Sequence, residues 1–142
     1  MNPATFAGQL LGPAPPHPSG HRSMPQLAGI LSALVTPFDT QGRLAAHAVP
    51  DLVALELAQG IDGFYVGGST GEAFLQTLDE RAEMLRAVAA AVGGRARLVA
   101  HVGAIATHHA VALAEVAAES GYDAVSSVPP FYYGFGAAEI AD

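Results

Sequence analysis

Two hydroxyl side chains stand among glycines in Gly67-Gly-Ser-Thr-Gly-Glu72, directly after the apolar run from Asp62 to Val66. That run, with its aromatic and β-branched residues, is typical of a buried strand. Glycines let a backbone turn sharply and approach a ligand closely, because no Cβ intervenes. Backbone N–H groups and the Ser69 and Thr70 hydroxyls would form a set of donors suited to a carboxylate or another small anion. A plain strand-to-helix turn is the alternative interpretation.

Tyr132 and Tyr133 form a second candidate site, because they follow the turn-forming pair Pro129-Pro130. A phenol hydroxyl can bind a carboxylate or relay a proton. In the alternative interpretation, one of the two rings only packs beneath its loop. We expect at least one of these tyrosines to be functional.

Residues 67–71 also match G-x-S-x-G, the nucleophile elbow of serine hydrolases, with Ser69 as the nucleophile. The context fits poorly, since the elbow's helix should start at once, whereas a capping box places the next helix start at Thr77. The phosphate-loop pattern requires a lysine that the chain lacks. Adjacent His108 and His109 should point apart on a helix, so no metal site is expected.

Composition restricts the possible functions. The 142 residues allow one domain or part of a larger one, and they include no cysteine. The net charge is −7, with six arginines and no lysine, which argues against nucleic acid or an anionic membrane as partner. No apolar run reaches the roughly 18–20 residues of a membrane span.

The chain divides into two parts. Residues 1–26 contain six prolines, so we expect a disordered tail. The tail lacks the pattern of a secretory signal, which favours a cytoplasmic protein. Residues 27–142 form the domain, in which strands and helices alternate. Strands are expected over 30–35, 62–66, 97–102 and 123–128, and helices over 46–59, 77–92 and 107–120.

This alternation predicts a parallel sheet with right-handed crossovers, in an α/β fold. Gly60-Ile-Asp62 and Gly121-Tyr-Asp123 repeat the same joint between a helix and the next strand. A barrel and an open doubly wound sheet both fit the pattern. In either, ligands bind at the carboxyl ends of the strands, where the glycine loop and the tyrosine loop lie.

Together, these motifs resemble the N-acetylneuraminate lyase and dihydrodipicolinate synthase family of class I pyruvate-dependent aldolases. The particular residues in the motifs favour the N-acetylneuraminate lyase branch. The resemblance spans residues 28–142. It rests on Leu34–Asp39, Gly63–Phe74, Ala100–Gly103 and Asp123–Tyr133. It implies an eight-stranded TIM barrel, usually a homotetramer. It also implies reversible cleavage of N-acetylneuraminate to N-acetylmannosamine and pyruvate through a Schiff base, with no cofactor or metal.

Carried over by position, Gly68, Ser69 and Thr70 correspond to the residues that bind the pyruvate carboxylate. The resemblance also gives Ser69 a place in a proton relay. Tyr132 corresponds to the tyrosine that reaches a neighbouring subunit's site and completes that relay. Thr36 and Glu72 occupy supporting positions.

The chain departs from the family pattern in one decisive respect. The family's Schiff-base lysine and its Tyr-Asn-x-Pro motif belong to later strands, and neither is present. The resemblance therefore implies about the first four β/α units, an N-terminal half barrel that is inactive alone and whose open strand edges favour association. The alternatives are a dihydrodipicolinate synthase-like enzyme, a non-catalytic half-barrel binding or assembly protein, and a serine hydrolase using Ser69.

Overall fold

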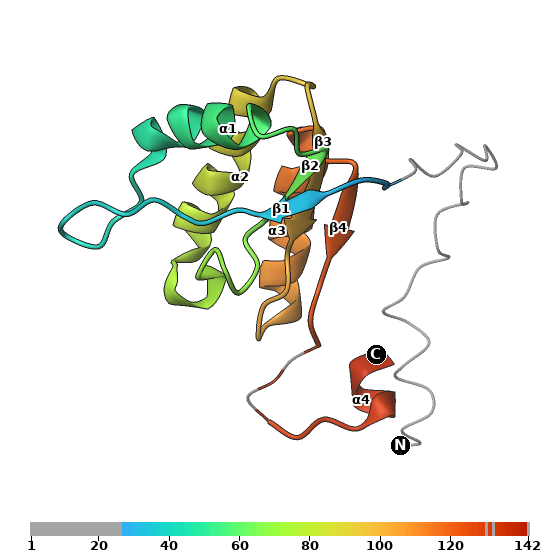
Figure 1. The fold of residues 1–142 in the computed structure, drawn as a ribbon. Coiled ribbons are helices and arrows are strands. Elements are labelled where there is room, and N and C mark those ends of the chain that lie inside the picture. Colours follow the sequence, from blue (N-terminus) through green and yellow to red (C-terminus); the bar gives the residue numbers. More distant parts are fainter. Residues whose placement is uncertain (1–26, 130, 132, 142) are drawn as a thin grey trace, which may run out of the picture.

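Four strands alternate with helices in the computed structural model, which describes residues 27–129, 131 and 133–141 (Figure 1). The elements run β1 (Leu31–Ala33), 3-10 helix η2 (Ala46–Ala48), α1 (Val49–Leu57), β2 (Gly63–Val66), 3-10 helix η3 (Ala73–Leu75), α2 (Leu78–Val92), β3 (Arg97–His101), α3 (Thr107–Glu119), β4 (Ala124–Ser126) and α4 (Ala137–Ala141). The expected disordered tail, residues 1–26, lies outside the described residues.

The strands form one parallel sheet in the order β1-β2-β3-β4, which confirms the predicted topology. Helices α1, α2 and α3 cover one face of the sheet (Figure 1). Apolar side chains from the strands and these helices make the core between them. Its buried members are Leu34, Val49, Val53, Phe64, Val66, Met84, Leu85, Val88, Val92, Leu98, Ala100, Val102, Leu113 and Ala117.

The longest helix, α2, begins where its sequence signal placed it. The Thr77 hydroxyl accepts a hydrogen bond from the Glu80 N–H at 3.2 Å, and the Glu80 carboxylate accepts one from the Thr77 N–H at 2.9 Å. This reciprocal pair is the predicted capping box. The helix ends at Gly93, whose left-handed conformation (φ +56°) suits a residue without a Cβ.

Several of the expected boundaries were wrong. Strands β1 and β4 have three residues each instead of six, because each is an edge strand that pairs on one side only. The predicted helix over 46–59 is divided into η2 and α1 and ends at Leu57. The short helix η3 was not predicted; it lies between the glycine loop and α2.

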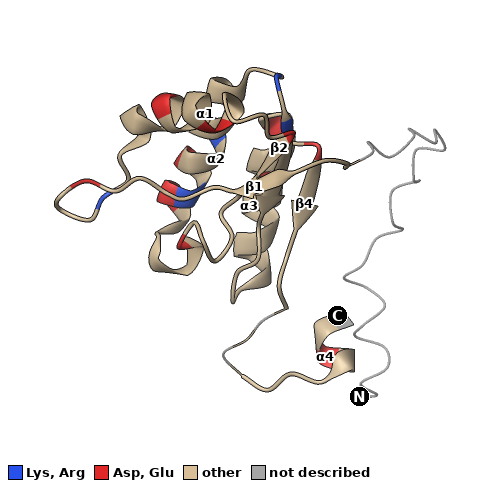
Figure 2. Ribbon diagram, in the orientation of Figure 1, with Lys and Arg blue, Asp and Glu red and all other residues tan. Residues whose placement is uncertain are grey.

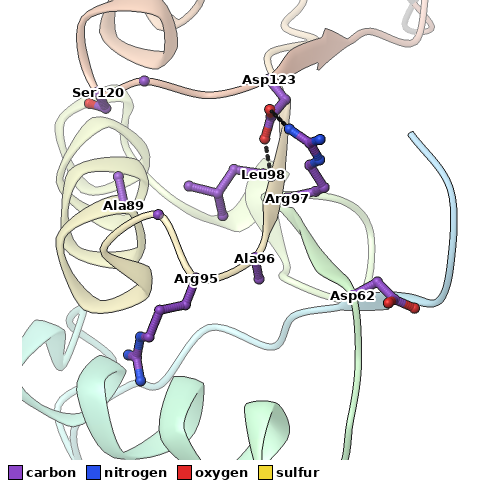
Figure 3. Close-up of a pocket in the computed structure, with 10 residues that line it drawn as sticks. Asp62, Ala89, Arg95, Ala96, Arg97, Leu98, Ser120 and Asp123 are labelled. Carbon is purple, nitrogen blue, oxygen red and sulfur yellow. Dashed lines mark hydrogen bonds and ion pairs between the residues drawn. The ribbon is translucent and has the colours of Figure 1, made fainter. Parts of the chain in front are cut away.

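The repeated Gly-x-Asp joint has a structural role at the amino ends of the strands. The Asp62 carboxylate accepts a hydrogen bond from the Ile30 N–H at 2.7 Å. Asp123 likewise accepts from the Leu98 N–H at 2.9 Å and pairs with Arg97 at 2.8 Å (Figure 3). Each aspartate thus satisfies a backbone donor near the start of the preceding strand. A cavity of about 330 Å³ adjoins these residues.

Charged residues gather on the helices and connecting segments, and the sheet is largely uncharged (Figure 2). In the part of the chain that the structure describes, no helix is both long and apolar enough to cross a membrane.

Candidate functional site

The glycine loop, residues 67–72, leaves the carboxyl end of β2 and leads into η3. Its backbone is left-handed at both ends, with φ of +76° at Gly67 and +55° at Glu72. Glycine adopts this conformation freely, whereas glutamate is strained in it. The two positions fold the loop back so that its middle residues face solvent.

Gly68 is a glycine for a packing reason. A Cβ at this position would lie only 2.6 Å from the Tyr65 ring. That ring is itself held, because the Tyr65 hydroxyl shares a 2.8 Å hydrogen bond with the Ser126 hydroxyl on β4. The loop therefore rests on an anchored aromatic ring.

The far end of the loop is fixed through the Gly71 carbonyl. It accepts hydrogen bonds from the buried Thr36 hydroxyl at 2.6 Å and from the Gln76 side-chain amide at 2.6 Å. The same amide also donates to the Thr36 oxygen at 3.3 Å. Sequence reasoning selected Thr36 and missed Gln76, since nothing in the sequence marks which polar side chain folds back onto the loop.

Between these two anchors, Ser69 and Thr70 are exposed. Within the described part of the chain, neither their hydroxyls nor their backbone N–H groups take part in a hydrogen bond. A rigid backbone thus presents two hydroxyls and two N–H donors at the carboxyl end of a parallel strand. Such a set of donors can bind a carboxylate.

Glu72 is exposed, and its carboxylate accepts no hydrogen bond from the described residues. Only its backbone is anchored: its N–H donates to the Ser69 carbonyl at 3.1 Å, and its carbonyl accepts from the Leu75 N–H at 2.9 Å. The loop also differs from a nucleophile elbow, because α2 begins only at Leu78. Among the described residues no histidine hydrogen-bonds to Ser69.

Tyr132 lies outside the described residues, so its predicted role stays a prediction. Its neighbour Phe131 packs edge-on against Phe74 of η3, with ring centroids 4.7 Å apart. Phe131 therefore contacts the element that follows the glycine loop. Tyr133 is 66% exposed, and its ring packs edge-on against Phe135.

Two buried polar side chains lie behind the loop. Arg81 on α2 donates hydrogen bonds to the His101 carbonyl at 3.1 Å, at the end of β3, and to the Gly103 carbonyl at 2.9 Å, just beyond it. Desolvation lowers the pKa of Arg81. Burial, and then the Arg81 charge, lower the pKa of His101 below its ordinary value, and a hydrogen bond to the Gly67 backbone partly opposes them.

His108 and His109 do not point apart as expected, since their ring centroids lie 4.2 Å from each other. Adjacent residues at the start of α3 can turn their rings together because both are exposed. No group of three or more metal-ligating side chains occurs among the described residues.

The fold and this loop together define a parallel α/β protein whose candidate site lies at the carboxyl ends of the strands. The chain belongs to the dihydrodipicolinate synthetase family, which matches residues 26–142. It is 54% identical over 115 residues to an N-acetylneuraminate lyase of Rhizobium meliloti, covering 81% of this chain and 38% of that protein. The chain thus spans about two fifths of the length of the curated relatives it matches.

Solved structures agree with this assignment. CdNal of Clostridium difficile, solved in complex with mannosamine, matches with a TM-score of 0.78 and 37% identity over 80% of this chain and 40% of that one. A catalytic lysine mutant of the Ruminococcus gnavus sialic acid aldolase matches with a TM-score of 0.77 and 30% identity over 80% and 37%. The four β/α units are therefore part of a TIM-barrel aldolase fold, and the predicted family and fold class are confirmed.

Proposed function

We propose that this chain forms the pyruvate-binding part of an N-acetylneuraminate lyase, which cleaves N-acetylneuraminate reversibly to N-acetylmannosamine and pyruvate. The observation that carries the proposal is the pair of exposed hydroxyls at Ser69 and Thr70, on a loop fixed at Gly71 by two hydrogen bonds. The 54% identity to a lyase of that name supports this substrate over that of a dihydrodipicolinate synthase.

In this proposal each residue has a defined task. The hydroxyls and N–H groups of Ser69 and Thr70 bind the carboxylate of pyruvate, and Gly68 allows the close approach. Ser69 also passes a proton in a relay that Tyr132, reaching from a neighbouring subunit, completes. Thr36 supports the loop from below, and Glu72 ends it.

The covalent step requires a group that these residues do not contain. A Schiff base forms when a primary amine attacks the ketone carbon of pyruvate and water leaves. The 142 residues include no lysine, so we propose that a lysine outside them supplies the amine. The complete protein would act as a cytoplasmic homo-oligomer, as the tyrosine relay between subunits requires.

Calorimetric titration with pyruvate tests the proposal. We expect saturable binding that the Ser69→Ala/Thr70→Val double variant weakens at least about tenfold, since two hydrogen bonds to an anion are lost. Ser120→Ala, at the amino end of the sheet, is the matched control and should bind as the unmodified protein does. Equal affinity of all three proteins for pyruvate would refute Ser69 and Thr70 as the residues that bind its carboxylate.

Two further assays separate the alternatives. Release of pyruvate from N-acetylneuraminate by the protein isolated from its source distinguishes the lyase from a dihydrodipicolinate synthase and from a non-catalytic binding protein. Labelling of Ser69 by a fluorophosphonate would instead support a serine hydrolase.

A further inference from the structure

Tyr65 stands in the middle of β2, on the face of the sheet away from α1, α2 and α3. Its neighbours Phe64 and Val66 are buried in the core against those helices, and successive side chains of a strand point to opposite faces. The Tyr65 hydroxyl shares its 2.8 Å hydrogen bond with the Ser126 hydroxyl on β4. Because β3 lies between β2 and β4, this hydrogen bond passes over a whole strand.

The Tyr65 side chain leans toward the carboxyl end of the sheet. In the register of the strands, Tyr65 pairs with Val99 of β3, and Val99 pairs with Ala124 of β4. Ser126 lies two residues beyond Ala124 along β4. The ring therefore points toward the glycine loop, and it lies against Gly68, where an added Cβ would come within 2.6 Å of the ring.

The hydrogen bond to Ser126 fixes the ring in this place. The side chain of Tyr65 is only half-buried, so packing alone leaves it room to turn. On one side the ring meets the His101 imidazole, with ring centroids 6.2 Å apart. In the part of the chain that the structure describes, Ser126 is the hydrogen-bond partner of the phenol hydroxyl. Without this partner, the ring could turn about its side-chain bonds to another staggered position.

The same hydrogen bond joins two parts of the candidate site. Tyr65 stands two residues before Gly67, where the glycine loop begins, and Ser126 ends β4, three residues before Pro129. The glycine loop and the tyrosine loop thus follow two strands that do not pair with each other. Chains of packed and hydrogen-bonded groups can couple such separate segments, and Ser126, the Tyr65 ring and Gly68 form a chain of this kind.

We propose that Tyr65 and Ser126 are positioning residues for the glycine loop. Their hydrogen bond holds the ring against Gly68, and the loop that rests on this ring presents its two hydroxyls to the carboxylate. Neither side chain needs to touch the ligand in this role. The effect on binding rests on the proposed pyruvate site, whereas the hold of the ring on the loop does not.

Pyruvate titration of matched variants tests the role. Tyr65→Phe removes the hydroxyl and keeps the ring, and Ser126→Ala removes its partner. Each variant should bind pyruvate about two- to tenfold more weakly, within the effect of one net hydrogen bond. The double variant should lose no more affinity than either single variant, because the bond can be lost only once. Ser126→Thr, which keeps a hydroxyl, should bind within about twofold of the unmodified protein.

Ser127→Ala is the matched control for these titrations. Its hydroxyl is exposed and donates to the Val128 carbonyl at 3.0 Å, so its removal should leave pyruvate affinity unchanged. Unchanged affinity in both Tyr65→Phe and Ser126→Ala, or additive losses in the double variant, would refute the role.

Amide NMR of the protein without pyruvate shows whether the ring moves. A nearby aromatic ring displaces the resonance of an N–H group, so the Gly68 and Ser69 N–H signals report on the position of the Tyr65 ring. Both signals should move in Ser126→Ala, in which the ring is retained but released, and stay in place in Ser127→Ala. A loss of stability alone would leave both signals where they are. Unmoved signals in Ser126→Ala would overturn the proposal.

The two proposals fail separately in these experiments. If the unmodified protein binds no pyruvate, the proposed function fails, and the N–H signals still decide whether the hydrogen bond positions the loop. If pyruvate binds at Ser69 and Thr70 but Tyr65→Phe and Ser126→Ala bind it as tightly as the unmodified protein does, only the present proposal fails.

Discussion

Gly68→Ala is the sharpest perturbation of the loop, because the added methyl group has nowhere to go. Its carbon would lie 2.6 Å from Cε1 and 3.0 Å from Cδ1 of Tyr65, about 1 Å inside the favourable carbon–carbon separation. The ring cannot swing away freely, since its hydroxyl is bonded to Ser126 at 2.8 Å. Either the loop lifts from the ring or the ring leaves Ser126.

The expected loss follows from these alternatives. Overpacking of this kind lowers the free energy of unfolding by about 1–3 kcal/mol. Loss of the Tyr65–Ser126 hydrogen bond contributes about 0.5–1.5 kcal/mol when the ring moves instead. We therefore expect a decrease of about 2 kcal/mol, measured by urea titration, and weaker pyruvate binding because Ser69 is displaced with the loop.

A double-mutant cycle tests the cause. In a Tyr65→Leu background, Gly68→Ala should lower the free energy of unfolding by less than about 0.5 kcal/mol, because the clash is gone. Gly134→Ala is the control, since a Cβ there meets nothing within 4 Å. An equal effect of Gly68→Ala in both backgrounds would refute the packing argument.

Four other predictions concern stability and association. Thr36→Val should lower the free energy of unfolding by about 1 kcal/mol through loss of the bond to the Gly71 carbonyl, whereas Thr40→Val, at an exposed site, should not. Asp123→Ala should lower it by about 1–2 kcal/mol and leave pyruvate affinity unchanged, because the residue lies at the amino end of the sheet. Burial lowers the pKa of His101 in the folded protein below its ordinary value of 6.5, so the unfolded chain binds a proton at a higher pH than the folded chain does. The free energy of unfolding should therefore fall as the pH decreases below 6.5, and it should fall less in His101→Asn. Both sheet edges are open in the described structure, so size-exclusion chromatography of the isolated chain should show association, and a sharp monomer peak with cooperative unfolding would contradict this.

The order of the strands and main helices was predictable because several of their boundaries have a local signal. The Thr77–Glu80 capping box acts within three residues of the helix start that it organises, and Gly60 and Gly121 follow the ends of α1 and α3 with a positive φ that suits glycine. The position of the glycine loop follows from the parallel topology, because the carboxyl ends of parallel strands all lie at the same end of the sheet.

The features that the sequence did not predict depend on contacts between residues that are distant in the sequence. Arg81 reaches carbonyls 20 and 22 residues away, and Gln76 reaches Thr36 across 40 residues. A sequence pattern indicates that such a residue faces inward but not which carbonyl it meets. The need for glycine at position 68 is of the same kind, since it comes from the Tyr65 ring below and not from a positive φ.

A pyruvate titration followed by amide NMR tests the central claim most directly, because it shows where the anion binds. The account predicts saturable shifts centred on the Ser69 and Thr70 N–H signals, at the carboxyl end of β2. The cavity at the amino ends of the strands, lined by Arg95 and Arg97, is the competing place for an anion (Figure 3). Shifts centred there, with Ser69 and Thr70 unmoved, would contradict the assignment of the glycine loop as the carboxylate site.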